Sequence, residues 1–349
     1  MAPTKILFTG ATGYIGGTIL SRFLAEPDAS SRFAFTVIVR DPKKAEKFKQ
    51  FGVTPVVGSH SDETLVEELA SQAEVVIATA DCDDVVAAKA TLAGLKKRAQ
   101  ATGTPPIFIN TSGTGEICDN ARGLFAEPSV YDDTNATQMA SIPPEAMHRN
   151  VDNAILAADV SQPGGFVKTY IILPGTVWGL AKTPLVAAGI QNDHSIQIPS
   201  QIQAAIDRKR AGMVGEGKNI WPNVEVHDLA ELFYIVYDKV TSGADIGHGY
   251  EGFFFGASDD HTLLEVAQEI GKALVATGRS DNPEPTSFTK EELDKYFQGS
   301  EYLGSNSRCK ANHSFSIGWK PAKKTADMLA DIPDEIESLI KSGRSIQLR

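Results

Sequence analysis

The sequence predicts an α/β protein with a doubly wound parallel sheet, and three observations support this fold class. Short apolar segments alternate with longer helical patterns through the first half of the chain. These segments are almost continuously hydrophobic, as strands covered by helices on both faces must be. A glycine-rich turn joins the first apolar segment to the first helical pattern. The 349 residues suffice for one large domain or two closely joined ones.

The expected elements follow in a regular order, each strand being an apolar run bounded by polar or turn-forming residues. Strands are expected at residues 5–9, 33–40, 53–57, 74–78, 106–111 and 166–173. Between them, helices are expected at 14–25, 42–51, from about 62, at 83–102 and at 143–160. Because every strand is followed by a helical segment, the strands are expected to run parallel, with helices on both faces of the sheet.

The composition excludes several classes of function. A net charge of −11 gives no general reason to bind nucleic acid or an anionic membrane. The three cysteines, Cys82, Cys118 and Cys309, form neither a CxxC pair nor a Cys/His cluster, so no metal site and no disulfide framework is expected. The chain shows no signal peptide and no apolar run of eighteen residues, so we expect a soluble, cytoplasmic protein.

The strongest local motif is the turn Gly10-Ala-Thr12-Gly13-Tyr14-Ile15-Gly16, which follows the first strand and opens the first helix. In this context Gly10 permits a tight turn, Gly13 allows the backbone to approach a pyrophosphate, and Gly16 allows the helix to pack closely on the strand. The motif predicts a Rossmann-type dinucleotide site. Thr12, Tyr14 and Ile15 belong to the same turn and are expected at the cofactor.

The end of the second strand bears on the choice of cofactor. Arg40 stands where an NAD-preferring site usually places a carboxylate, and a guanidinium there can bind a 2′-phosphate through two hydrogen bonds. The sequence therefore favours NADP(H) over NAD(H), although Asp41 could still contact a ribose hydroxyl. Further cofactor contacts are expected from Ser59 at the end of the third strand, and from Thr79 and Ala80 at the end of the fourth.

Past residue 174 the alternation of strands and helices ends. Residues 1–174 and 225–250 are expected to form the dinucleotide-binding domain. Residues 175–224 and 251–349 are expected to form a smaller, discontinuous substrate-binding lobe, because they contain loops rich in Gly, Ser, Asn and Pro between isolated helices.

Taken together, five segments resemble the extended short-chain dehydrogenase/reductases, in their epimerase/dehydratase-like branch. They are residues 9–16, 110–113, 173–179, 221–230 and 305–321. The resemblance implies a catalytic role for Ser112 and places Pro174, Thr176 and Val177 beside the nicotinamide. It also suggests that Trp178, Glu225 and His227 line the substrate pocket, with Tyr131 in a loop nearby.

The sequence departs from this family at the catalytic centre. These enzymes carry Tyr-x-x-x-Lys on the helix after the fifth strand, but no such pair occurs between residues 112 and 170. Alignment of apolar positions puts His148 at the tyrosine position and Asp152 at the lysine position. The alternative for the tyrosine position is Tyr131, but the two aspartates that follow it are typical of a loop, so His148 is preferred. On a helix, residues four apart share a face, so Asp152 is expected to hold His148 as a proton donor or to contact the nicotinamide ribose. The alternative is that both residues are structural and the site is inactive.

The leading functional hypothesis is an NADP(H)-dependent oxidoreductase acting on a small carbonyl or alcohol substrate. A nucleotide-sugar epimerase or dehydratase is a second hypothesis, and a non-catalytic NADP(H) sensor is a third. The expected partner is a small-molecule substrate, and a homodimer is possible because the resembling family often dimerises.

Overall fold

A seven-stranded parallel sheet forms the centre of the protein. The computed structural model describes residues 2–343 and residue 346. The strand order is β11-β7-β5-β4-β1-β2-β3, and every pairing within this sheet is parallel. The strands are β1 (Thr4–Thr9), β2 (Phe33–Val39), β3 (Thr54–Val57), β4 (Val75–Ala78), β5 (Ile107–Thr111), β7 (Lys168–Pro174) and β11 (Phe253–Gly256). The predicted doubly wound, Rossmann-type α/β fold is confirmed.

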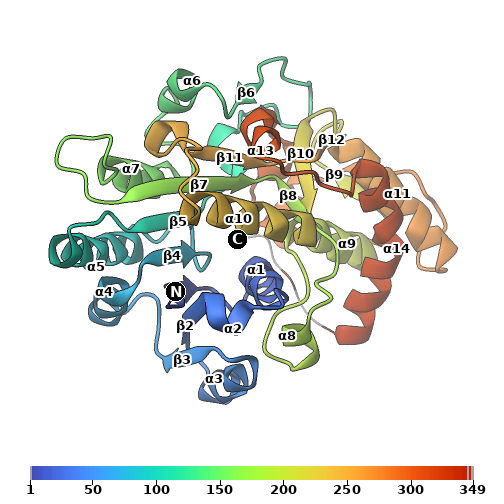
Figure 1. Ribbon diagram of the computed structural model, residues 1–349. Coiled ribbons are helices and arrows are strands. Elements are labelled where there is room, and N and C mark those ends of the chain that lie inside the picture. Colours follow the sequence, from blue (N-terminus) through green and yellow to red (C-terminus); the bar gives the residue numbers. More distant parts are fainter. Residues whose placement is uncertain (1, 344–345, 347–349) are drawn as a thin grey trace.

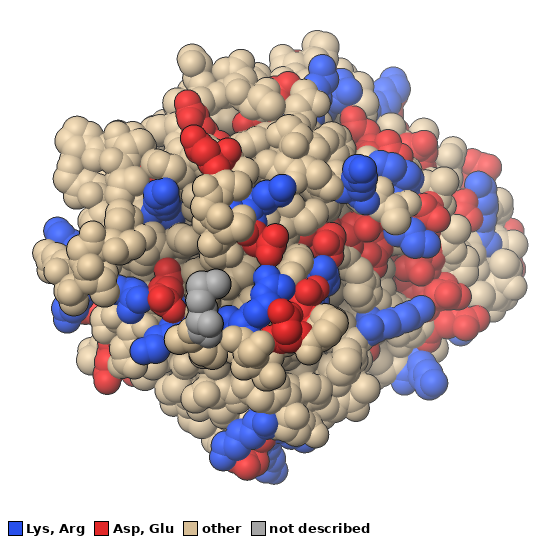
Figure 2. Space-filling model, viewed as in Figure 1, with Lys and Arg blue, Asp and Glu red and all other residues tan. Residues whose placement is uncertain are grey.

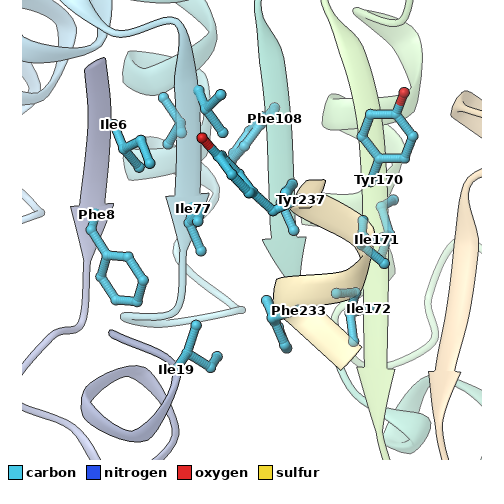
Figure 3. Packing of buried hydrophobic residues seen from close by; sticks show 14 of the residues in the cluster. Ile6, Phe8, Ile19, Ile77, Phe108, Tyr170, Ile171, Ile172, Phe233 and Tyr237 are labelled. Carbon is cyan, nitrogen blue, oxygen red and sulfur yellow. The ribbon is translucent and has the colours of Figure 1, made fainter. Parts of the chain in front are cut away.

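Helices cover both faces of the sheet (Figure 1). On one face α1 (Tyr14–Leu24) packs against α10 (Val226–Thr241), and on the other α4 (Glu63–Gln72), α5 (Val85–Thr102) and α7 (Arg149–Ala157) pack together. Figure 3 shows side chains of several strands, such as Ile77 and Ile171, facing Phe233 and Tyr237 of α10. Burial of this apolar layer is the main source of stability, at roughly 25 cal/mol per Å² of buried apolar surface.

Aspartates in the loops that follow β2, β3 and β4 cap three of the helices. The side chains of Asp41, Asp62 and Asp84 accept hydrogen bonds from backbone N–H groups two or three residues later. They begin α3 (Pro42–Phe48), α4 and α5 in turn. Each carboxylate satisfies an N–H group that the helix leaves unpaired and lies at the positive end of the helix dipole. The sequence therefore fixes each strand-to-helix boundary locally.

The second part of the molecule lies to the right in Figure 1. It contains a three-stranded sheet of β12 (Asp259–Thr262), β10 (Ile220–Glu225) and β8 (Thr176–Trp178). The helices α9 (Gln197–Arg208), α11 (Leu263–Ala276) and α14 (Thr325–Ser342) enclose a separate core, which includes Trp178 and Ile270. On the face drawn in Figure 2, basic side chains are dispersed among acidic ones. Acidic side chains gather in the right half of this view, where the second part of the molecule lies.

Shorter elements complete the fold. The short helices are α2 (Ala29–Arg32), α6 (Ala136–Ala140), α8 (Pro184–Ala187), α12 (Lys290–Phe297) and α13 (Asn312–Ser316). The short strands are β6 (Tyr131–Asp132), β9 (Gly212–Met213), β13 (Thr286–Ser287) and β14 (Cys309–Lys310). Turns of 3₁₀ helix lie at Lys49–Phe51, Thr114–Ile117, Gly249–Glu251 and Tyr302–Gly304.

Two boundaries differ from the sequence prediction. Residues 253–256, expected in the substrate lobe, form the edge strand β11 of the main sheet, because three consecutive phenylalanines pair beside β7 and are fully buried. The helix expected at 143–160 begins only at Arg149, because the two prolines at 143–144 and the left-handed backbone of His148 (φ 67°) keep the preceding residues in turns. The remaining domain boundaries stay a prediction. Within the described residues, no helix combines the length and apolarity needed to cross a membrane.

Candidate active site

A cavity of about 980 Å³ opens where the carboxyl ends of the parallel strands meet the second part of the molecule. This is where ligands bind in open α/β sheets. Ten of the predicted site residues line it: Gly13, Tyr14, Ile15, Gly16, Thr79, Ala80, Ser112, His148, Pro174 and Val177. They come from the turn after β1 and the start of α1, from the ends of β4, β5 and β7, from β8 and from the residue that precedes α7.

The glycine turn forms one end of the cavity. Gly10 has a φ of +78°, and a methyl group there would lie 2.6 Å from the backbone carbonyl of Thr79. A methyl group on Gly16 would lie 2.4 Å from the carbonyl oxygen of Gly10. Gly13 precedes α1 in extended conformation, and no side chain caps the helix. The first N–H groups of α1 are therefore available to an anion, and the helix dipole favours one. This cradle fits a dinucleotide pyrophosphate.

Two residues after β2, Arg40 and Asp41, are candidates to contact the adenosine ribose of the cofactor, and the structure distinguishes between them. Asp41 accepts a hydrogen bond from the Lys43 N–H at 2.8 Å and caps α3, so its carboxylate is engaged in the fold. Arg40 is exposed and forms no ion pair among the described residues. An unpaired guanidinium at this strand end fits a 2′-phosphate. Ser59, which follows β3, is half-buried and accepts a hydrogen bond from the Ser61 N–H at 3.2 Å.

His148 lies at the opposite end of the cavity, as the residue that precedes α7. Its Nδ1 atom lies 2.7 Å from Oδ1 of Asp83, a residue of the loop between β4 and α5. Its Nε2 atom points the other way, since a methyl group on Gly113 would lie 3.1 Å from it. The Asp83 carboxylate thus fixes the ring so that Nε2 faces the cavity. The expected pairing of His148 with Asp152 is wrong, because His148 precedes the helix rather than lying on its face.

The Tyr302 hydroxyl also lines this part of the cavity. A methyl group on Gly115 would lie 2.7 Å from the hydroxyl oxygen of Tyr302 and 3.3 Å from Nε2 of His148. Burial, together with the neighbouring Cys118 side chain, raises the pKa of Tyr302 well above its usual value, so the phenol stays protonated at neutral pH. Ser112 is buried in the same part of the cavity lining, and its side chain acts on the Asp152 carboxyl as a hydrogen-bond donor that lowers the pKa of that group.

Asp152 lies behind the cavity in a buried charged group. Its Oδ1 accepts a hydrogen bond from the Asn110 side chain at 3.4 Å, while Glu116 and Arg149 form an ion pair at 3.0 Å with both side chains almost fully buried. Burial, reinforced by the negative charge of Glu116, raises the pKa of Asp152 to about 8. Burial likewise raises the pKa of Glu116 to about 7, against the opposing effect of Arg149. Arg149 thus provides one positive charge for two buried carboxyl groups, Glu116 and Asp152, and this favours a proton on one of the two.

Three predicted pocket residues have other roles. Trp178 is buried in the second core and donates a hydrogen bond to Oδ1 of Asn223 at 3.0 Å, so it forms no wall of the cavity. Glu225 caps α10 by accepting hydrogen bonds from the N–H groups of His227 and Asp228, and it also pairs with the His227 ring at 2.7 Å. Neither Glu225 nor His227 reaches the cavity, because the start of α10 requires both.

Tyr131 also lies away from the cavity, in β6, where it pairs with Cys309 of β14. Thr176 does not line the cavity itself. Its hydroxyl donates a hydrogen bond at 3.2 Å to the side-chain oxygen of Gln197, which does line the cavity. Gly10 and Thr12 support the glycine turn from outside the lining, and the Thr12 carbonyl accepts a hydrogen bond from the Asn192 N–H at 3.0 Å.

Sequence reasoning missed most of the substrate side. Met147, Ile196, Trp221, Phe297 and Tyr302 line the cavity and make this wall largely apolar. Among the described lining residues there is no lysine or arginine, and Asp83 is the one carboxylate. No local pattern identifies these residues, because they come from separate loops that only the tertiary fold brings together.

Comparisons with known proteins agree with this architecture. Residues 3–103 match the NmrA-like family. The oxidase ucsJ of an Acremonium species is 26% identical over 332 residues, which cover 91% of this chain and 92% of that protein. A phenylcoumaran benzylic ether reductase of Ginkgo biloba is 28% identical over 177 residues, covering 47% of this chain and 54% of the reductase.

Solved structures extend the similarity to the whole chain. The UDP-glucose 4-epimerase of Thermotoga maritima superimposes with a TM-score of 0.63 at 14% identity, covering 98% of this chain and all of the epimerase. The UDP-glucose 4-epimerase of Thermus thermophilus, solved with NAD, gives a TM-score of 0.60 at 16% identity and covers 96% of this chain and 99% of the epimerase. The solved structures thus show that the chain has the fold of the UDP-glucose 4-epimerases, as the motifs predicted, and its residues 3–103 match the NmrA-like family.

Proposed function

We propose that this protein is an NADP(H)-dependent oxidoreductase that reduces the carbonyl group of a small, uncharged substrate. One observation carries the proposal: His148 presents Nε2 to the cavity while Asp83 holds its other ring nitrogen at 2.7 Å, and the same cavity ends in an uncapped glycine turn. A proton donor and a dinucleotide cradle therefore share one cavity. The oxidase and reductase relatives support an oxidoreductase.

The cofactor would be held largely by the backbone. The N–H groups at the start of α1 would bind the pyrophosphate, and Arg40 would bind the 2′-phosphate. Thr79 and Ala80 would contact the adenosine half, and Pro174 and Val177 would contact the nicotinamide half. When bound, the reduced nicotinamide supplies a hydride.

Side chains of the protein protonate and stabilise the substrate oxygen. His148 donates a proton from Nε2, Asp83 keeps the ring in that orientation, and Tyr302 donates a hydrogen bond that stabilises the developing negative charge. The apolar wall of Trp221, Phe297 and Met147 excludes water from this space.

The lining of the cavity disfavours the nucleotide-sugar hypothesis. A substrate diphosphate needs cations or clustered N–H groups, and the described lining has no lysine or arginine. In this proposal the cofactor pyrophosphate would occupy the glycine turn. An uncharged substrate suits the remaining walls.

The proposal is tested by titrating the protein with NADPH and NADH, followed by absorbance at 340 nm with a panel of neutral and anionic carbonyl compounds. We expect tighter binding of NADPH and oxidation of NADPH with neutral carbonyls. Tight NADPH binding without turnover of any carbonyl would favour the sensor hypothesis. Co-purified NAD with turnover of sugar nucleotides would favour the epimerase.

A further inference from the structure

Three potential metal ligands meet at the mouth of the cavity. Cys82 and Asp83 are adjacent in the loop between β4 and α5, and His148 precedes α7. The Cys82 sulfur lies 3.3 Å from Nδ1 of His148, and Oδ1 of Asp83 lies 2.7 Å from the same nitrogen. One ligand atom from each of the three residues lies within 4.8 Å of the others. Residues 66 positions apart in the chain thus converge on one point.

We propose that Cys82, Asp83 and His148 form a binding site for a borderline-soft divalent cation such as Zn²⁺, and that the cation controls the proton donor. Thiolate, imidazole and carboxylate are the ligand types that zinc takes in proteins. With bond lengths of about 2.0–2.3 Å, a tetrahedral ion needs its ligand atoms about 3.3–3.6 Å apart. The observed separations of 3.3 and 2.7 Å come within reach of this geometry through small side-chain rotations.

The surrounding structure holds His148 and the backbone of Asp83 in place, and the Asp83 side chain leaves the group open to solvent. The His148 ring is 12% exposed, and its backbone is fixed as the residue before α7. The Asp83 N–H donates a hydrogen bond to Oδ1 of Asp81 at 3.0 Å, which fixes the loop. The Asp83 side chain is 56% exposed, so a cation and one water ligand can enter from solvent. Three protein ligands with an open fourth position are the usual arrangement for an accessible zinc.

The carboxylates of Asp81 and Asp83 surround the Cys82 thiol with negative charge. A bound dication would favour the thiolate, and the thiol proton would pass to solvent. The carboxylates that disfavour a lone thiolate favour the cation. Magnesium and calcium, which prefer oxygen ligands, suit this site poorly.

Binding of the cation has a direct consequence for His148. The ion takes the Nδ1 lone pair, so His148 can no longer pass between imidazole and imidazolium, and Asp83 no longer orients it. Zn²⁺ would therefore inhibit turnover without displacing the dinucleotide from the glycine turn. This consequence rests on the proposed function, whereas the binding site itself does not.

Cobalt(II) is the probe that tests the site, because a cobalt–thiolate bond gives a near-ultraviolet charge-transfer band. The full-length protein is titrated with Co²⁺ and then with Zn²⁺ in competition, together with the variants Cys82→Ser and Cys118→Ser. Cys118 is the matched control, since it is also a half-buried free cysteine. We expect the band in the wild type and in Cys118→Ser. Cys82→Ser should lack the band and should bind Zn²⁺ at least about 100-fold more weakly.

Absence of the band in the wild type would overturn the proposal, as would its retention in Cys82→Ser. Cys82→Ala, checked by circular dichroism, replaces Cys82→Ser if that variant fails to fold. NADPH turnover is measured on the same samples with and without Zn²⁺. Zn²⁺ binding that leaves turnover unchanged would overturn the inhibitory role and leave the site standing. Loss of turnover in the wild type, but not in Cys82→Ser, at the same Zn²⁺ concentration would support both.

Discussion

The two ends of the cavity are built in different ways. At the cofactor end, backbone atoms of Gly10, Gly13 and Gly16 form the cradle, and close packing forbids side chains at two of the three positions. At the end that we propose to hold the proton donor, side chains from three separate segments meet: Asp83 orients His148, and Tyr302 comes from the second part of the chain. A cradle made of backbone depends on spacing within one turn. A donor made of side chains depends on the tertiary fold.

The largest effect is expected at the proton-donor end. Replacement of His148 by Asn keeps a residue that tolerates the left-handed backbone at φ 67°, but it removes the proton donor. We expect kcat to fall by about 10²- to 10⁴-fold while the affinity for NADPH stays unchanged. Steady-state kinetics and a fluorescence titration measure the two quantities on the same sample. A fall in NADPH affinity with kcat intact would contradict this assignment, because it would place His148 in cofactor binding rather than in proton transfer.

At the glycine turn, Gly10→Ala is expected to weaken NADPH binding strongly. Gly10 and Gly52 share a left-handed backbone, with φ of +78° and +72°, but a methyl group meets the Thr79 carbonyl at 2.6 Å only at Gly10, whereas space is open at Gly52. We expect an affinity loss of at least about 100-fold, or 2.7 kcal/mol, in Gly10→Ala. Gly52→Ala should bind NADPH normally.

Thermal unfolding distinguishes a binding defect from misfolding in this pair. If Gly10→Ala fails to fold, Gly13→Val provides the same test, since Gly13 lines the cavity and its nearest contact is the Gly10 carbonyl oxygen at 3.1 Å. Normal NADPH binding by Gly13→Val would show that the pyrophosphate lies elsewhere.

A smaller effect is expected from Arg40→Gln, which removes the cation at the end of β2. Charge-assisted hydrogen bonds contribute about 1.5–3 kcal/mol, so NADPH affinity should fall by about 10- to 100-fold while NADH affinity changes little. Lys49→Gln, an exposed change on the adjacent 3₁₀ turn, is the control. Equal losses for NADPH and NADH in Arg40→Gln would contradict the assignment of Arg40 to the 2′-phosphate.

The smallest effect concerns Asp152, which the structure places behind the donor. Its pKa in the folded protein is raised from 3.8 to about 8, so its contribution to stability is complete below pH 3.8 and is lost as the pH rises towards 8. Asp152→Asn, which can still accept the hydrogen bond from Asn110, should therefore be more stable than the wild type at pH 8.5, by about 1–3 kcal/mol.

Denaturant unfolding at pH 5 and pH 8.5 measures this difference, which should shrink at the lower pH. Glu145→Gln, at an exposed position before α7, should show no such dependence. If Asp152→Asn instead lost stability at pH 8.5, a charged Asp152 paired with Arg149 would be the better description of this group.

The same contrast explains which features could be predicted from the sequence and which could not. Apolar runs and helical patterns predicted the strands and helices of the first half, and the glycine spacing predicted the turn that precedes α1. Asp83 escaped prediction because its partner His148 lies 65 residues away. Tyr302 and Trp221 escaped for the same reason. Trp178 was predicted as a pocket wall from its neighbours in the sequence, but burial of its large ring in the second core determines its position.

The most direct test of the account is a crystal structure of the protein with NADP⁺. We expect the pyrophosphate on the N–H groups at the start of α1, the 2′-phosphate against Arg40, and Nε2 of His148 facing the space above nicotinamide C4. A dinucleotide bound away from the glycine turn would contradict the account. So would a nicotinamide ring separated from His148 by more than one water molecule.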